Sequence, residues 1–138
     1  MDNQIPVVIL CGGKGLRIRD DLINVPKALV PIGNIPVIMH VMKIYAHYGF
    51  KKFILTLGYG GETIKQYFKN YSWITKDFRF RAHKDLNGGV GNIEIIDNND
   101  IQDFEIIFAE TGIDTQTGGR IKKVQKYIDA DTFMATYC

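Results

Sequence analysis

The apolar run IPVVILC, residues 5–11, is followed directly by a pair of glycines. A short, continuous apolar run that ends in glycine is typical of a strand buried on both faces, as in a parallel sheet. The run at residues 53–57 ends in GYG, and the run at residues 104–109 precedes the polar stretch ETGIDTQTGGR. We therefore predict two buried strands, at residues 5–11 and 53–57, and a further strand at residues 104–109, each followed by a polar loop that contains glycine.

Segments with helical spacing separate these strands. Pro36 is tolerated in a first helical turn, apolar residues then recur at helical intervals, and Gly49 is a natural helix end. Residues 64–71 repeat the amphipathic pattern, residues 121–128 predict a short helix, and a last apolar run covers residues 133–138. This alternation predicts an α/β fold, a Rossmann-like, mostly parallel sheet with helices on both faces.

The middle of the chain carries a weaker pattern. Residues 78–82 alternate like a strand, and the glycine-rich residues 87–92 indicate a turn. Residues 93–96 fit either an edge strand or one arm of a hairpin. Neither alternative is favoured by the residues alone.

Three glycine-bearing loops begin at predicted carboxyl ends of strands, at Gly12, Gly58 and Thr111. The carboxyl ends of parallel strands lie along one edge of the sheet, which is where ligands bind in such folds. We therefore expect the three loops to form one site.

The first of these loops, GGKGLR at residues 12–17, has the composition of a phosphate-binding loop. Glycine lets the backbone approach phosphate oxygens with its N–H groups, and Lys14 and Arg17 add positive charge. It lacks the Gly-Lys-Ser/Thr of a Walker loop and the third glycine of a dinucleotide loop. Glycine content alone fits a simple turn equally well.

Lys27 lies between two prolines in the stretch NVPKALVP, residues 24–31. Proline stiffens the backbone and so fixes the direction of the lysine, which suits a site that organises a polyphosphate. An ordinary surface lysine in a proline-bordered turn is the commoner case for an isolated Pro-Lys.

Composition excludes several classes of protein. The chain has 138 residues, 46% of them hydrophobic and 23% charged, which fits one globular domain. A net charge of +2 with dispersed basic residues argues against a nucleic-acid partner, and no apolar run is long enough to span a membrane. We find no export signal, and Cys11 and Cys138 lack metal-ligand spacing, so we expect two free thiols in the cytoplasm.

Two stretches together resemble a known family. LCGGKGLR followed by NVPKALVPIGNIPVIMHVMKIYAHYGFKKFILTLGYGGETIKQYF resembles the N-terminal half of the sugar-phosphate nucleotidyltransferases. ETGIDTQTGGRIKKV, followed by the final FMATYC, is similar to the glucose-1-phosphate cytidylyltransferases within that family. The resemblance covers nearly the whole chain except residues 72–102, and it implies one incomplete nucleotide-binding domain over residues 1–138, a truncated nucleotide-diphospho-sugar transferase fold.

The resemblance implies transfer of a cytidylyl group from CTP to glucose 1-phosphate, which gives CDP-glucose and pyrophosphate, with Mg²⁺ in the full-length protein. It assigns the catalytic roles to Arg17 and Lys27. It implies that these two cations and Arg120 converge on one anion-binding crevice. The nucleotide-binding residues implied are Leu10, Cys11, Gly12, Gly13, Lys14, Gly15, Leu16, Arg17, Lys27, Thr115, Gly118, Gly119, Arg120 and Cys138.

The chain departs from the family pattern at three places. Leu16 replaces a threonine, Val25 replaces the first lysine of a pair, and the chain ends at the residue before the metal-binding aspartate, so no metal ligand is assigned. We expect this chain by itself to be a poor catalyst, and its final strand to promote self-association into a homo-oligomer. A related enzyme that uses another nucleoside triphosphate, and a non-catalytic nucleotide-binding module, remain the alternatives.

Overall fold

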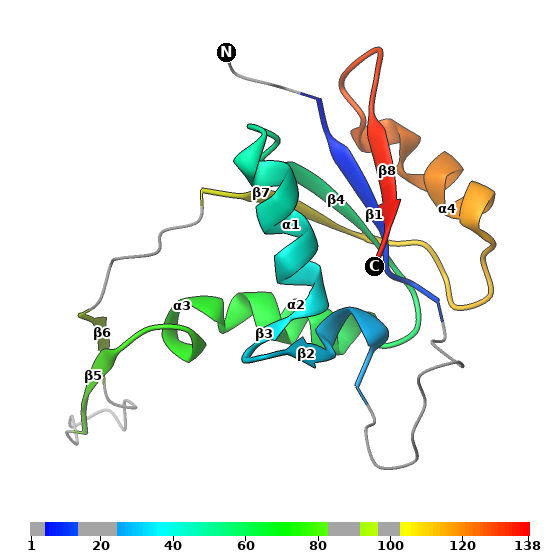
Figure 1. The fold of residues 1–138 in the computed structure, drawn as a ribbon. Coiled ribbons are helices and arrows are strands. Elements are labelled where there is room, and N and C mark those ends of the chain that lie inside the picture. The colour runs from blue at the N-terminus through cyan, green and yellow to red at the C-terminus, as the bar shows by residue number, and fades with distance from the viewer. Residues whose placement is uncertain (1–4, 14–24, 83–91, 97–102) are drawn as a thin grey trace. The chain divides into compact units, whose positions relative to one another are not determined.

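The structure is a computed structural model that describes residues 5–13, 25–82, 92–96 and 103–138 (Figure 1). The chain divides into two compact units. One comprises Met1–Lys65 and Asp103–Cys138, and the other comprises Gln66–Gln102. Within the described ranges, no helix has the length and apolar character needed to cross a bilayer.

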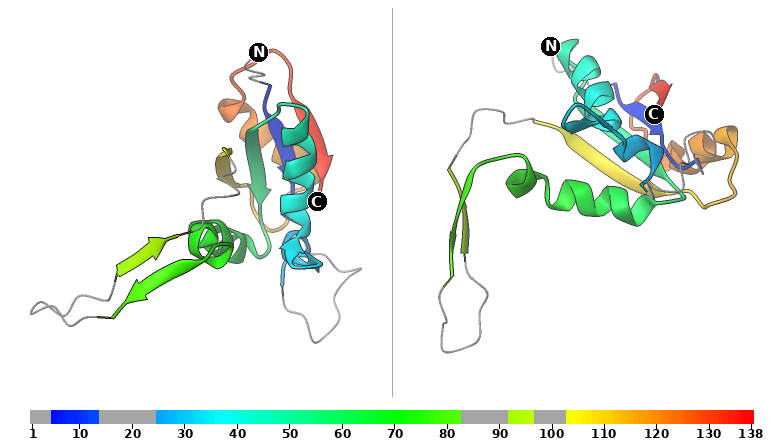
Figure 2. Two further views of the ribbon diagram at one scale, coloured as in Figure 1. Left: turned by 60° about the vertical axis from the view of Figure 1, so that its left-hand side comes forward. Right: turned by 60° about the horizontal axis from the view of Figure 1, so that its bottom comes forward.

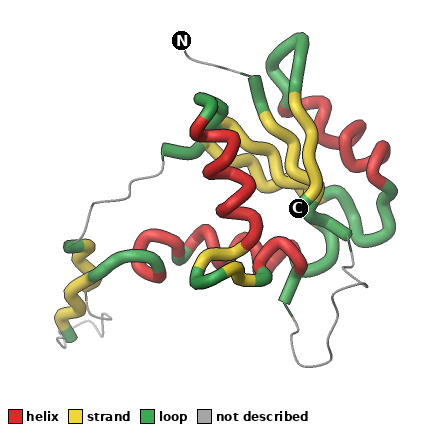
Figure 3. The backbone as a smooth tube through the Cα atoms, in the orientation of Figure 1, coloured by secondary structure: helices red, strands yellow, loops and turns green. Residues whose placement is uncertain are grey.

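A four-stranded sheet forms the centre of the first unit (Figures 1 and 3). Its strands run in the order β7-β4-β1-β8, and each neighbouring pair is parallel. The predicted parallel sheet is therefore confirmed, and all four carboxyl ends lie along one edge. The strands are β1 (Val7–Leu10), β4 (Lys52–Leu57), β7 (Glu105–Glu110) and β8 (Met134–Tyr137).

The inner strands are buried because their side chains are apolar on both faces. Val7, Val8 and Ile9 of β1 are fully buried, as are Phe53, Ile54, Leu55 and Leu57 of β4. The continuous apolar runs that predicted these strands reflect this burial on two sides. Strand β8 has only one neighbour in the described sheet and alternates between half-buried and exposed residues.

Helices cover both faces of the sheet, as predicted. Val124 of α4 (Thr117–Val124) packs against Val8, Ile54 and Ala109, so these side chains define one face. Neighbouring strand residues alternate between faces, which turns Val7 and Phe53 to the other side. Helix α1 (Val37–His47) crosses that side with Ile38, Met39 and Met42 buried (Figure 2).

One boundary differs from the sequence prediction. The predicted polar loop extended to Arg120, but α4 begins at Thr117 and is continued by the 3₁₀ turn η2 (Gln125–Tyr127). Gly118 and Gly119 therefore lie in the first helical turn. A Cβ on Gly119 would lie 2.9 Å from Cγ2 of Thr115, so the close approach of Thr115 favours glycine at this position.

The segment between the first strand and α1 contains short elements that the sequence did not predict. They are η1 (Lys27–Leu29), β2 (Pro31–Ile32) and β3 (Ile35–Pro36), with Gly33 at φ 67° in the turn between the two strands. His40 Nε2 lies 3.1 Å from Ile32 O and ties this turn to α1. Strands of two residues carry no periodic signal, which explains why the pattern missed them.

The second unit holds a two-stranded antiparallel ribbon, β5 (Phe78–Arg81) and β6 (Asn92–Ile95). The pairs Phe78↔Ile95 and Phe80↔Ile93 lie on one face, and Arg79 binds Glu94 on the other at 3.2 Å. The hairpin alternative for this region is thus confirmed. The predicted turn falls mostly on residues 87–91, which lie outside the described residues. Helices α2 (Gly61–Lys69) and α3 (Tyr71–Ile74) precede the ribbon.

Candidate functional site

The order of the strands marks one place along the carboxyl edge as a ligand crevice. The connection from β1 to β4 runs over the α1 face, and the connection from β7 to β8 runs over the α4 face (Figures 1 and 2). The chain therefore runs outward from β1 through β4 to β7 and returns to place β8 on the other side of β1. This reversal of strand order marks the switch point where α/β sheets bind ligands. Gly12 and Gly13 follow β1 at this point, and Cys138 follows β8, with its amide 3.3 Å from Leu10 O.

The loops that follow β1, β4 and β7 meet directly, as predicted. The amide of Tyr59 donates to Gly12 O at 3.2 Å. The amide and the hydroxyl of Thr111 both donate to Leu57 O at 2.8 Å. We call Gly12, Gly58, Thr111 and Arg120 the three-loop junction, because Arg120 joins these contacts from α4.

Arg120 is only 5% exposed, and its guanidinium donates to oxygens of the loops after β1 and β7 and to the carbonyl at the end of β4. Nη1 lies 2.7 Å from Thr111 Oγ1 and 3.4 Å from Leu57 O. Nη2 lies 3.1 Å from Gly12 O and 3.2 Å from Ile113 O. All four acceptors are neutral oxygens of the protein.

The two junction glycines make room for this guanidinium. A Cβ on Gly58 would lie 2.7 Å from Arg120 Nη1 and 2.7 Å from the carbonyl oxygens of Gly12 and Gly112. A Cβ on Gly12 would overlap the guanidinium and lie 3.0 Å from the amide nitrogen of Gly58. These glycines therefore serve close packing of the loops.

Other glycines of the same edge face open space. No atom lies within 4 Å of a Cβ built on Gly13 or on Gly118. Both residues are exposed, whereas Gly12, the direct neighbour of Gly13, is buried. The pair Gly12-Gly13 thus combines one glycine that packs inward with one that leaves its backbone open to a ligand.

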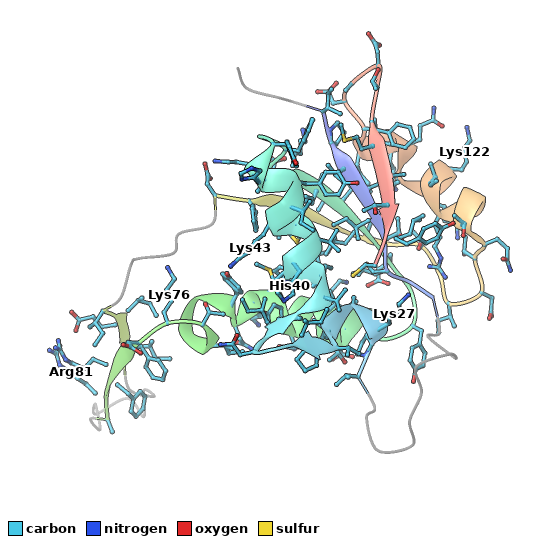
Figure 4. The ribbon with its side chains drawn as sticks, viewed as in Figure 1. Lys27, His40, Lys43, Lys76, Arg81 and Lys122 are labelled. Carbon is cyan, nitrogen blue, oxygen red and sulfur yellow. The ribbon has the colours of Figure 1, made fainter. Side chains whose placement is uncertain are left out.

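Lys27 is exposed, and its neighbours Pro26 and Ala28 are buried. Pro26 packs on Gly60 of the loop after β4, where a Cβ on the glycine would lie 3.1 Å from Pro26 Cβ. This contact joins the proline-bordered stretch to the loop after β4. Figure 4 shows Lys27 near the carboxyl edge of the sheet, and its charge acts on Cys138.

The two thiols at the switch point stay protonated at neutral pH. The pKa of Cys11 is raised to about 12, mainly by burial and also by the neighbouring Cys138, while Arg120 acts in the opposite direction. Burial raises the pKa of Cys138 to about 11, while Lys27 lowers it. Both cysteines are free, and the Cys11 thiol lies 3.4 Å from Thr56 O. Neither is a nucleophile under ordinary conditions, because the thiolate is the reactive form.

The loop after β7 is held by a second basic residue of α4. Lys123 Nζ donates to Thr111 O at 2.9 Å and lies 3.3 Å from Thr115 Oγ1, while the Thr115 hydroxyl itself donates to Thr111 O. Gly112 allows this tight turn through a φ of 93°. Sequence reasoning missed Lys123 and Thr111 as site residues. The signal was the i, i+3 spacing of Arg120 and Lys123, which puts both on one side of a helix.

The structure therefore brings most of the sequence-predicted residues to one edge. Arg120 lowers the pKa of Cys11 and Lys27 lowers that of Cys138, so each cation acts on one of the two neighbouring thiols. Lys14, Gly15, Leu16 and Arg17 lie outside the described residues. The predicted residues described at this edge are Leu10, Cys11, Gly12, Gly13, Lys27, Thr115, Gly118, Gly119, Arg120 and Cys138.

Comparisons with known proteins agree with this geometry. Residues 7–87 match the family model of the MobA-like NTP transferase domain. The chain is 42% identical over 130 residues to the "Probable glucose-1-phosphate cytidylyltransferase" of Bacillus subtilis, a match that covers 94% of this chain and 48% of that protein. This chain thus spans about half the length of that curated relative.

Two further matches are more distant. The D-glycero-alpha-D-manno-heptose 1-phosphate guanylyltransferase of Campylobacter jejuni is 36% identical over 63 residues, which is 46% of this chain and 28% of that protein. The crystal structure of HddC from Yersinia pseudotuberculosis superposes with a TM-score of 0.63 at 24% identity. It covers 96% of this chain and 47% of that chain, so the sheet and its helices have the same fold.

Proposed function

The chain belongs to the MobA-like NTP transferase family, and from this premise we propose that it binds CTP and that the protein transfers a cytidylyl group to glucose 1-phosphate. The products are CDP-glucose and pyrophosphate. One observation carries the proposal. The open backbone of Gly13 follows β1 at the switch point of a parallel sheet, and the exposed Lys27 acts electrostatically on Cys138, which follows β8 at the same point.

The reaction needs positioning and charge stabilisation rather than a covalent intermediate. An oxygen of the sugar phosphate attacks the α-phosphorus of CTP, and the bond from that phosphorus to the β-phosphate bridging oxygen breaks. Pyrophosphate leaves with the electron pair. The role proposed for Lys27 is to align the phosphates, and the role proposed for Arg17, outside the described residues, is to stabilise the leaving group.

The choice of CTP rests on the loop after β7. Backbone N–H groups that bind phosphate do not distinguish bases, so base selection must come from other residues. Thr115 lies in the loop before α4, and Gly118 and Gly119 lie in the first turn of that helix. The named cytidylyltransferase matches 94% of this chain, whereas the guanylyltransferase matches 46%. This difference supports cytosine as the base.

Magnesium is proposed for the full-length protein only. Mg²⁺ takes oxygen ligands in octahedral geometry, and the crevice here presents two protonated thiols. Among the residues that the structure describes, no three His, Cys, Asp or Glu side chains gather as a metal site. The described residues do not fit the ion, so no step is assigned to it. We also propose a reducing compartment, the cytoplasm, in which both thiols would stay free.

A calorimetric titration tests the proposal. The folded chain is titrated with CTP, UTP, GTP and ATP at one salt concentration, with and without Mg²⁺. We expect CTP to bind more tightly than the other three. Equal affinity for all four would assign the chain to a transferase of another or broader nucleotide specificity, and absence of heat with every nucleotide would refute the proposal.

A second measurement separates an enzyme from a non-catalytic nucleotide-binding module. Val25 takes the place of a lysine in the family pattern. Its side chain is 40% exposed and apolar, so it supplies no positive charge at this position. Release of pyrophosphate from CTP and glucose 1-phosphate is measured for the full-length protein. CTP binding without pyrophosphate release would favour the module.

A further inference from the structure

We propose that Arg120 is a positioning residue, which holds the loops after β1, β4 and β7 at a fixed spacing and shapes the crevice without contacting the nucleotide. The inference rests on the proposed function for its ligand. It departs from the family resemblance, which implies that Arg120 lines the nucleotide pocket and binds an anion.

The hydrogen bonds of the Arg120 guanidinium are made to protein oxygens. Its two terminal nitrogens make four contacts of 2.7 to 3.4 Å. The acceptors lie in the loops after β1 and β7 and on Leu57, the last residue of β4. A guanidinium presents its N–H groups in one rigid plane. Since both terminal nitrogens are directed at protein oxygens, their N–H groups are committed to the loops.

Two of the acceptors of Arg120 also join neighbouring segments to one another. Gly12 O and Leu57 O each accept a loop-to-loop bond as well as the bond from Arg120. The guanidinium therefore adds to contacts that already join neighbouring loops, and it adds the Ile113 carbonyl. Because Gly13 follows Gly12 directly, a shift of the Gly12 carbonyl moves the open backbone that faces the ligand.

The space around the guanidinium also fits a positioning role. Gly12 and Gly58 leave the volume that it fills, since a Cβ on either would collide with it. Arg120 is also buried, which keeps its terminal nitrogens away from a ligand in the crevice. The two glycines thus allow the guanidinium to pack tightly between the loops, as a positioning role requires.

Lysine cannot replace this support. Its ammonium is a point charge on a flexible chain and cannot reach four acceptors spread along a plane. Arg120→Lys keeps the positive charge and loses the geometry, so it distinguishes a positioning role from a purely electrostatic one. Lys122→Ala is the matched control, because it removes one positive charge from the same helix and Lys122 bonds to Gln125 on the exposed side at 2.7 Å.

The test combines hydrogen exchange with nucleotide binding on the whole chain. In the absence of nucleotide, Arg120→Ala and Arg120→Lys are both expected to raise exchange at the amides of Tyr59 and Thr111 by about tenfold or more, the factor for losing a charged hydrogen bond of about 1.5 kcal/mol. The amide of Ile54, in the centre of β4, should keep its protection. Lys122→Ala should leave all three amides unchanged.

Binding then separates support from direct contact. CTP, CMP and cytidine should each lose affinity by a similar factor in both Arg120 variants. A loss that grows with the number of phosphates, full recovery with lysine, or unchanged exchange at Tyr59 and Thr111 would overturn the inference. If the Arg120 variants do not fold, Thr111→Val removes one acceptor and should show the same pattern with a smaller magnitude. If the unmodified chain binds no nucleotide, the proposed function fails, and the exchange measurement still tests Arg120.

Discussion

Two regions of the carboxyl edge differ in what their residues contact. In the three-loop junction, the loops and Arg120 satisfy one another, and no buried side-chain polar atom of the described residues lacks a partner. At the open rim, which we define as Gly13, Lys27 and Gly118, a Cβ added to either glycine would have no atom within 4 Å, and the lysine is exposed. The junction thus determines the shape of the crevice, and the rim is the part left for a ligand.

This difference predicts that substitutions in the two regions have opposite signatures. A junction substitution should lower the free energy of unfolding and impair binding through the altered shape. A rim substitution should impair binding and leave stability unchanged. The following experiments compare the regions by this criterion.

Gly58→Ala should have the largest effect. Its new methyl group would lie 2.7 Å from two backbone oxygens and from Arg120 Nη1, and backbone oxygens cannot rotate away. We expect a loss of about 3 kcal/mol, the upper part of the range for overpacking. Urea denaturation measures it, with Gly13→Ala as the matched control, expected to change stability by less than about 0.5 kcal/mol. Equal stability of the two variants would remove the distinction between junction and rim.

Thr111→Val should have the next effect. The substitution keeps the shape of the side chain but removes the hydroxyl that donates to Leu57 O and accepts from Arg120. Buried partners left without a hydrogen bond cost about 1–3 kcal/mol, so we expect a loss of about 2 kcal/mol in thermal or urea unfolding. Thr63→Val on the exposed side of α2 provides the control. A Thr111 variant as stable as this control would show that the junction does not depend on the hydroxyl.

The sequence predicted the sheet because burial on both faces leaves a strong signal. Continuous apolar runs such as residues 5–11 occur where helices cover both sides of a strand, and the glycines after them marked the carboxyl edge. It also predicted that the loops meet, since that follows from parallel strands alone. The short β2 and β3 were missed because two residues cannot show a period.

The division of labour within the site could not be predicted. Gly12 and Gly13 are chemically identical neighbours. A Cβ on Gly12 would collide with Arg120, which lies 108 residues further along the chain, whereas a Cβ on Gly13 would meet no atom within 4 Å. Likewise, Lys122 and Lys123 look alike in sequence, yet only Lys123 reaches Thr111. Such contacts depend on tertiary packing, which local patterns do not encode.

Lys27→Ala should lower nucleotide affinity by about tenfold, the effect of losing one charged hydrogen bond to phosphate, and should leave stability unchanged. The expected loss is larger for CTP than for cytidine, because the lysine is proposed to bind phosphate. Calorimetry measures both. Lys51→Ala, also an exposed lysine but at the amino end of β4, is the control. If the Lys27 variant lost stability but kept its CTP affinity, Lys27 would have a structural role like the junction residues and no role in binding.

The smallest effect concerns the two thiols: Cys11 is influenced by Arg120 of the junction, and Cys138 is influenced by Lys27 of the rim. The pKa of Cys11 is raised to about 12 and lowered somewhat by Arg120, whereas that of Cys138 is raised to about 11 and lowered by Lys27. The folded state therefore favours the protonated thiols, so their contribution to stability is present below pH 9.0, the ordinary thiol value, and is lost as the pH rises toward 11–12.

At pH 9 to 10, Cys138 should react with a thiol reagent faster than Cys11. Lys27→Ala should slow the labelling of Cys138 and leave Cys11 unchanged, since removing a nearby cation raises a thiol pKa. If Lys27→Ala slowed the labelling of Cys11 and Cys138 equally, Lys27 would act on both thiols, and the junction and the rim would not be electrostatically separate.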